Sequence, residues 1–181
     1  MIRAWPRLAS QPVFDAGLFS VTRDRTRSPR TGKEHEVYVV HMVDWLMTVP
    51  LTEGGELVLV RQYRHGSGET SLEAPGGLHD EAREQPEEGA ARELAEETGY
   101  GGGVIRFLGE LRPQPAFMSN RVRIYLAQGV RRRAEPRPDA GEDLEVVLID
   151  PREVPARIAS GEIDNAMTVT ALALARFDGY L

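Results

Sequence analysis

The chain has 181 residues, of which 41% are hydrophobic and 28% are charged, a composition that fits one ordinary globular domain with a good core. Its net charge of −6 argues against broad nucleic-acid binding, because nucleic-acid phosphates attract clustered basic residues. The absence of cysteine excludes disulfides, thiol catalysis and cysteine-ligated zinc and favours a cytoplasmic location, while no apolar run reaches the ~18 residues of a membrane span.

The first half of the chain has the pattern of a β-meander. β-branched and aromatic residues gather between turn-forming residues, which predicts strands at residues 13–22, 36–43, 45–51 and 56–63. A polar turn is expected over residues 23–34, and Gly54-Gly55 before the last of these strands is typical of a hairpin.

A helix of about 13 residues is expected next, from Pro86 to Thr98. Pro86 suits the first turn of a helix, and Gly99 supplies a natural stop. At ~100° per residue, Glu93 and Glu97 share one face one turn apart. The opposite face is mostly apolar and consists of Ala90, Ala91, Leu94 and Ala95. One face should therefore pack, and the other should be acidic.

The second half alternates strands, loops and helices. Strands are expected at residues 104–109, 121–127 and 144–149, and helices at residues 151–160 and 165–177. The connections are a proline-rich loop at residues 112–120 and a charged loop at residues 131–141. This order predicts a mixed sheet between helices.

Negative charge is concentrated around the expected helix. Between Glu69 and Glu97 there are ten acidic residues against two arginines, a local charge of −8. Arg92 can offset part of the repulsion by pairing with Glu88 and Glu96, each four residues away. Divalent cations bound through carboxylate oxygen atoms would offset the remaining repulsion. The alternative is a solvated acidic helix face.

The segment from Gly77 to Tyr100 resembles the Nudix box. The match consists of a glycine, a spaced glutamate at Glu84 and then the run Arg92-Glu93-Leu94-Ala95-Glu96-Glu97-Thr98-Gly99-Tyr100. Six residues separate Gly77 from Glu84, where the family pattern has five, so the register of Gly76 and Gly77 stays open. The wider chain is similar to the ADP-ribose pyrophosphatase-like nucleoside diphosphate sugar hydrolases, through residues 60–64, 72–77, Pro115 and 161–166.

The resemblance implies an α/β (α+β) fold, the Nudix α/β/α sandwich with a mixed β-sheet and an N-terminal antiparallel β-meander. Residues 1–50 would then form the β segment that two subunits exchange, and residues 51–181 the hydrolase domain. A homodimer is therefore expected, with a monomer whose sheet edge is capped as the alternative.

The resemblance also implies a metal site. It assigns Mg²⁺, with Mn²⁺ as an alternative, to the carboxylates of Glu93 and Glu97 and the carbonyl of Gly76. Glu96 could assist these ligands, and Glu84 is either structural or a distal metal ligand.

The resemblance to the ADP-ribose pyrophosphatase-like hydrolases also implies a general base, on a loop that precedes a strand near the end of the sequence. Glu142 matches that place, Asp143 is the second choice, and Glu96 could share the work. Arg92 is expected to belong to the catalytic machinery by holding Glu84 or Glu88, with a direct substrate contact as the alternative. A solvent-facing acid at a strand entrance is the alternative reading of Glu142.

Substrate contacts are implied at Arg64 and at Pro115, Met118 and Ser119. The alternatives are a surface arginine and side chains that only pack their loop. The expected reaction converts ADP-ribose to AMP and ribose 5-phosphate. GDP-mannose, other nucleoside diphosphate sugars and dinucleoside polyphosphates are alternative substrates, and a non-catalytic domain that binds a nucleotide sugar is the alternative function.

Overall fold

The computed structural model describes residues 1–139 and 141–181. The chain forms two compact units, one made of Met1–Asp44 with Leu111–Arg121, the other of Trp45–Glu110 with Val122–Leu181. A boundary after residue 50 falls inside strand β4 (Trp45–Thr52) of the larger unit. Val49 and Leu51 of this strand are core residues, which is why β4 stays with the larger unit.

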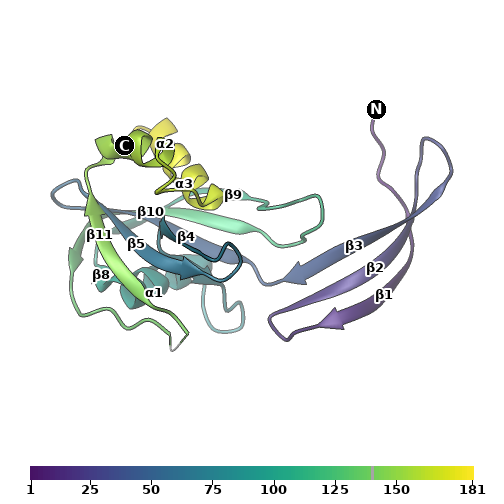
Figure 1. Ribbon diagram of the computed structural model, residues 1–181, viewed down its shortest axis with the longest axis horizontal. Helices are drawn as coiled ribbons and strands as arrows, with labels where there is room; N and C mark the ends of the chain where they lie inside the picture. Colours follow the sequence, from purple (N-terminus) through teal and green to yellow (C-terminus); the bar gives the residue numbers. More distant parts are fainter. Residues whose placement is uncertain (140) are drawn as a thin grey trace. The chain divides into compact units, whose positions relative to one another are not determined.

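The smaller unit is an antiparallel sheet of three strands in the order β1-β2-β3 (Figure 1). The strands are β1 (Arg7–Asp15), β2 (Phe19–Arg27) and β3 (Glu34–Met42). The glycine break expected within residues 13–22 is the β1–β2 turn, where Gly17 has φ +78° and its amide donates to Asp15. The polar turn expected over residues 23–34 is wrong in extent, because cross-strand ion pairs from Arg25 and Arg27 to Glu34 continue the ladder.

The segment Leu111–Arg121 joins this sheet beside β3. Met118 forms a parallel bridge with Val40, whose amide donates to the carbonyl of Phe117 at 2.8 Å. The amide of Ser119 donates back to the carbonyl of Val40 at 3.0 Å. These bonds fix the expected proline-rich loop to the sheet by its backbone.

The larger unit contains a mixed eight-stranded sheet with the main order β11-β5-β4-β10-β8. Its central pair, β4 and β10, is parallel, and the pairs β8–β10, β5–β11, β4–β5, β4–β7 and β5–β6 are antiparallel. The remaining strands are β5 (Leu57–Arg64), β6 (Glu69–Glu73), β7 (Gly76–Leu78), β8 (Tyr100–Gly101), β9 (Val104–Leu111), β10 (Val122–Arg132) and β11 (Leu144–Ile149). Of the loop expected at residues 131–141, Arg131 and Arg132 continue β10, and residue 140 lies outside the described residues.

Helices cover both faces of this sheet, with α1 (Pro86–Thr98) on one side and α2 (Val154–Ala159) and α3 (Ala166–Phe177) on the other (Figure 1). A 3₁₀ turn at Pro151–Glu153 precedes α2. The buried core includes Val49, Leu57, Leu59, Leu94, Ile124 and Leu126. The expected α/β/α architecture with a mixed sheet and an N-terminal meander is confirmed. Within the described part of the chain, no helix is long and apolar enough to cross a membrane.

The bounds of α1 agree with the sequence prediction. Gln85 and Glu88 form a capping box at its start, and Pro86 occupies the first helical position. Gly99 ends the helix with φ +73°, a conformation that side chains with a Cβ rarely adopt. These local signals place the acidic face of the helix one short loop after β7.

Candidate metal centre

Glu97 is the most deeply buried carboxylate of the acidic helix face, with 2% of the residue exposed. Its Oε2 accepts a hydrogen bond from the amide of Gly76 at 3.0 Å. Burial raises the pKa of Glu97 to about 8, and the negative charges of Glu142 and Glu93 act in the same direction. The backbone amide and the charge of Arg64 offset only part of this effect. The charged form of Glu97 is therefore unfavourable here unless a positive charge lies close to it.

Glu93 lies one turn before Glu97 on the same face, with 14% of its side chain exposed. Burial raises its pKa, although the adjacent Arg92 acts against the shift. A Cβ on Gly77 would lie 2.5 Å from the carboxyl carbon of Glu93 and 2.6 Å from each carboxyl oxygen. The carboxylate can occupy its place only because residue 77 has no side chain.

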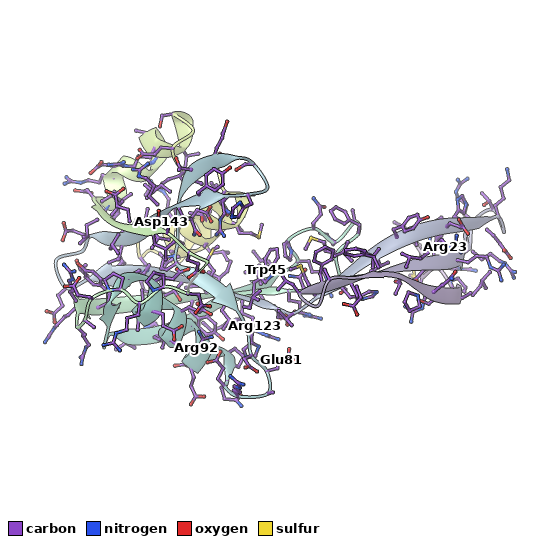
Figure 2. All side chains as sticks on the ribbon, turned by 60° about the horizontal axis from the view of Figure 1, so that its bottom comes forward. Arg23, Trp45, Glu81, Arg92, Arg123 and Asp143 are labelled. Carbon is purple, nitrogen blue, oxygen red and sulfur yellow. The ribbon has the colours of Figure 1, made fainter. Side chains whose placement is uncertain are left out.

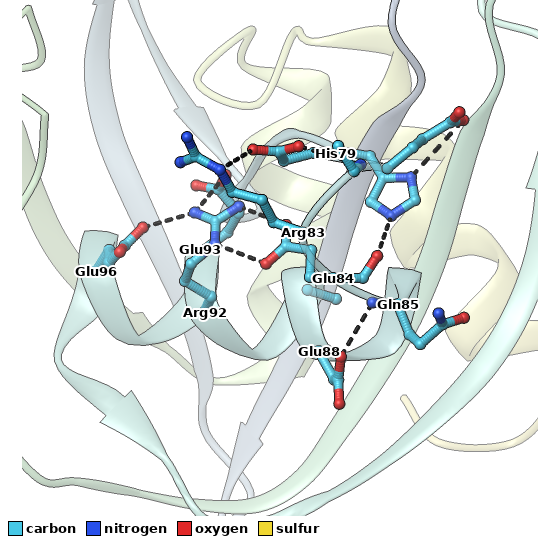
Figure 3. Close-up of polar contacts among 12 residues, drawn as sticks. His79, Arg83, Glu84, Gln85, Glu88, Arg92, Glu93 and Glu96 are labelled. Atoms are coloured by element: carbon cyan, nitrogen blue, oxygen red, sulfur yellow. Dashed lines mark hydrogen bonds and ion pairs between the residues drawn. The ribbon is translucent and has the colours of Figure 1, made fainter.

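Arg92 gathers the other carboxylates of the site (Figure 3). Its Nε and Nη2 donate to the two oxygens of Glu84 at 2.9 and 2.8 Å, and its Nη1 donates to Glu96 at 2.7 Å. The same Nη1 lies 2.9 Å from Oε1 of Glu93. The bidentate bond to Arg92 lowers the pKa of Glu84. The expected pair of Arg92 with Glu96 is present.

The expected pair of Arg92 with Glu88 is wrong. The Oε2 of Glu88 accepts from the amide of Gln85 at 3.0 Å, because this carboxylate completes the capping box at the start of α1. Glu84 takes the place beside Arg92, and Gly89 makes room for it. A Cβ on Gly89 would lie 2.6 Å from Oε1 of Glu84. Sequence reasoning missed Gly89, whose one signal is a glycine inside an otherwise good helix.

The loop that faces the helix is fixed by β7. Gly76 and Gly77 pair with Met47 and Leu46 of β4. A Cβ on Gly76 would lie 2.2 Å from the carbonyl oxygen of Leu46, so the close strand approach requires glycine here. The carbonyl of Pro75 also accepts from the amide of Thr48 at 2.9 Å. These bonds place the amide of Gly76 against Glu97.

Glu142 and Asp143 directly precede β11, and both are exposed. Asp143 is labelled in Figure 2. The Oε2 of Glu142 accepts from the amide of Asp139 at 3.0 Å. The charge of Glu142 raises the pKa of both Glu93 and Glu97, which places it within electrostatic reach of the acidic helix face.

Arg64, at the end of β5, forms a bidentate ion pair with Glu73. Its Nε and Nη2 donate to the two oxygens of Glu73 at 2.9 and 2.7 Å. This pair is the main reason that the pKa of Arg64 is raised, and the charges of Glu97 and Glu142 add to it. Arg64 keeps 46% of its side chain exposed, whereas Glu73 is 1% exposed. Sequence reasoning missed Glu73, since a buried carboxylate has no local pattern.

The structure brings together Glu84, Arg92, Glu93, Glu96 and Glu97 with Gly76 in the larger unit. Pro115, Met118 and Ser119 belong to the smaller unit, where Met118 forms the bridge with Val40 and the amide of Ser119 donates to the carbonyl of Val40.

The residues fit a divalent cation by their chemistry, because carboxylate and carbonyl oxygens are what Mg²⁺ prefers. The buried Glu97, with a neutral amide as its hydrogen-bond donor, and the cradle that Gly77 leaves for Glu93 are the observations that support this fit. Across residues 1–139 and 141–181, no three acidic or histidine side chains converge on one point as metal ligands. Arg92 instead draws Glu84, Glu93 and Glu96 toward its guanidinium.

Comparison with known proteins gives a family model, two relatives and a solved structure that match this chain. The model of the NUDIX domain matches residues 41–168. The ADP-ribose pyrophosphatase of Mycobacterium tuberculosis is 32% identical over 166 residues, which cover 91% of this chain and 80% of that protein. The ADP-ribose pyrophosphatase of Bacillus subtilis is 26% identical, over 91% of this chain and 89% of that protein. A crystal structure of an ADP compounds hydrolase shares the fold with a TM-score of 0.85 at 24% identity, over 100% of this chain and 99% of that one.

Proposed function

Because this chain belongs to the Nudix family, we propose that it hydrolyses the pyrophosphate bond of a nucleoside diphosphate sugar in a metal-dependent reaction. ADP-ribose is the proposed substrate, with AMP and ribose 5-phosphate as products. Two relatives that match 91% of the chain are named ADP-ribose pyrophosphatases, which supports this choice. The single observation that carries the proposal is the pair formed by the buried Glu97 and the partly buried Glu93, beside Gly76 and Gly77.

The residues proposed to hold the ion are Glu93, Glu97 and the carbonyl of Gly76, with Glu84 as a further ligand. Mg²⁺ is the proposed ion, and Mn²⁺ can take its place. When bound, the ion neutralises phosphate charge and lowers the pKa of water. Arg92 holds Glu84 and Glu96 by hydrogen bonds, so it fixes the side chains around the ligands.

Glu142 is the proposed general base, which accepts the proton of the attacking water. Its exposed carboxylate accepts a hydrogen bond from the neutral backbone amide of Asp139. This bond can be exchanged for a hydrogen bond to water. Asp143 and Glu96 are the second choices: Asp143 is exposed, and Glu96 is half-exposed beside Arg92.

Arg64 is the proposed contact to the substrate phosphates. Its bidentate bond to Glu73 orients the guanidinium, and the exposed half of the side chain is open to a ligand. Pro115, Met118 and Ser119 are proposed contacts of the nucleotide.

A homodimer is proposed from the smaller unit. Every residue of β1 is exposed, and this strand lies at the edge of its sheet. Large apolar side chains are exposed on the same unit, among them Val13, Phe14, Leu18 and Tyr38. An open edge strand with exposed apolar residues favours pairing with another chain.

Product analysis tests the proposed reaction. The protein is incubated with Mg²⁺ and separately with ADP-ribose, GDP-mannose, UDP-glucose and diadenosine polyphosphates, and the products are separated by ion-pair chromatography. Release of AMP and ribose 5-phosphate well above the other reactions is expected. Preference for GDP-mannose would support the proposed site but refute ADP-ribose as the substrate. Binding without turnover would favour a nucleotide-sugar sensor.

A further inference from the structure

The start of α3 binds the segment that leads to the candidate metal centre. Asn165 caps the helix, because its Oδ1 accepts from the amides of Met167 and Thr168 at 2.9 and 3.0 Å. Its Nδ2 donates to Oε2 of Glu73 at 2.9 Å. Because the oxygen Oδ1 accepts the two capping bonds, the side-chain nitrogen Nδ2 is the atom that faces Glu73 and donates to it.

Thr168 makes the second contact between α3 and this segment. Its Oγ1 accepts from the amide of Ala74 at 3.1 Å, and both residues are buried, at 0% and 3% exposed. The chain before the helix runs along the same strand: Asp164 accepts from the hydroxyl of Ser71 at 2.6 Å. Residues 164–168 therefore bind residues 71–74 through both side chains and backbone.

Both contacts lie next to groups of the proposed site. The carboxylate bonded to Asn165 is the one that orients Arg64. The amide bonded to Thr168 lies two residues before Gly76, whose own amide binds Glu97. The carboxylate of Glu73 accepts two hydrogen bonds from Arg64 and one from Asn165. Loss of Asn165 therefore leaves, of these three bonds, only the two from Arg64.

We infer that Asn165 and Thr168 are positioning residues for the active site, and this inference rests on the proposed function. Asn165 holds the plane of the Glu73 carboxylate and through it the guanidinium of Arg64. Thr168 holds the backbone at Ala74 and through it the position of Gly76. The two residues act on different parts of the reaction, one on substrate binding and the other on the metal ligands.

Replacement of Asn165 tests the first half. In Asn165→Asp the new carboxylate keeps the helix cap, but it replaces the donor toward Glu73 with a like charge. The KM for ADP-ribose is expected to rise roughly tenfold, the order of one hydrogen bond to a charged group, with kcat within about twofold of wild type. Asn165→Ser keeps a neutral cap without the donor and should show a smaller rise, so the test survives if the aspartate variant does not fold.

A double-mutant cycle separates positioning from general damage. In an Arg64→Ala background, Asn165→Ser should leave KM unchanged, because the group that it positions is gone. An equal rise of KM with and without Arg64 would overturn the role of Asn165. So would a wild-type KM in both Asn165 variants.

Replacement of Thr168 tests the second half. Thr168→Val removes the acceptor of the Ala74 amide at nearly constant volume, and Thr168→Ser retains it. The matched control is Thr170→Val, since the hydroxyl of Thr170 bonds the carbonyl of Ala166 on its own helix. Thr168→Val should raise the half-saturating Mg²⁺ concentration by roughly threefold to tenfold at unchanged KM, whereas Thr168→Ser and Thr170→Val should match wild type.

Two readouts keep this inference apart from the proposed reaction. Calorimetric titration with Mg²⁺ and hydrogen exchange of the peptide that covers residues 71–78 need no turnover. Faster exchange and weaker Mg²⁺ binding in Thr168→Val support the inference even if the wild-type protein cleaves none of the nucleotides. Unchanged Mg²⁺ binding in a folded Thr168→Val variant would overturn the role of Thr168, and failure of the wild type alone to turn over would refute only the reaction.

Discussion

Gly77→Ala should reduce turnover without unfolding the protein. The added Cβ would lie 2.5 Å from the carboxyl carbon of Glu93, whereas carbon atoms in contact prefer about 3.5–4.0 Å. The carboxylate must therefore retreat by about 1 Å. A misplacement of this size in an active site can reduce the rate roughly 10²-fold. Since the displaced group is the end of a flexible side chain, the melting temperature should stay close to that of wild type.

Two other glycines provide the comparison. A Cβ on Gly101 would meet no heavy atom within 4 Å, so Gly101→Ala should match wild type in both kcat and melting temperature. A Cβ on Gly76 would lie 2.2 Å from the backbone oxygen of Leu46, which cannot yield as a side chain does, so Gly76→Ala should lose stability as well as activity. Steady-state kinetics and thermal unfolding of the three variants decide the matter. Wild-type kcat in Gly77→Ala would refute the argument that Glu93 must occupy this place.

The remaining predictions concern the metal, the helix and the oligomer. Dialysis against EDTA should abolish turnover and added Mg²⁺ should restore it; activity that persists without divalent ions would contradict the proposed mechanism. Glu97→Gln should reduce kcat about 10³-fold or more, while the folded protein keeps its stability because burial already favours the neutral form of this side chain; a fully active variant would rule out Glu97 as a ligand. Arg92→Lys should reduce kcat at least tenfold, because an ammonium group cannot replace the bidentate bond to Glu84, and chromatographic assay of AMP release measures the loss. Sedimentation should show a wild-type dimer and a Phe14→Lys monomer, since the charge lies on the exposed edge strand β1; a wild type that sediments as a monomer at all concentrations would refute the proposed dimer.

The sequence predicted best the features that local chemistry determines. The helix Pro86–Thr98 has a proline at its first position, a glycine after its last residue and one acidic face, and the structure confirms these bounds. The strands β4 and β10 and the helices α2 and α3 also lie close to the residues where the sequence predicted strands and helices. These signals span a few residues each, so they need no knowledge of distant partners.

Contacts between distant segments could not be predicted in the same way. For Arg92 the sequence left Glu84 and Glu88 as alternatives, and only the structure shows that Glu84, eight residues away on the preceding loop, forms the bidentate pair. The short strands β6 and β7 were missed because their five and three residues carry little periodicity. Glu73 was missed for a related reason: its burial depends on Arg64 and Asn165, which lie on other elements.

The position of Glu97 depends on more than the helix that carries it. Its hydrogen-bond donor is the amide of Gly76 in β7, and the backbone just before β7 is bonded to Thr168 of α3. Arg92 contacts Glu84, Glu93 and Glu96, so three carboxylates share one guanidinium and the cluster keeps its net negative charge. The acidic helix α1 therefore supplies the proposed ligands, and strand β7 and helix α3 determine their positions. A substitution on either supporting element should change metal affinity before it changes the stability of α1.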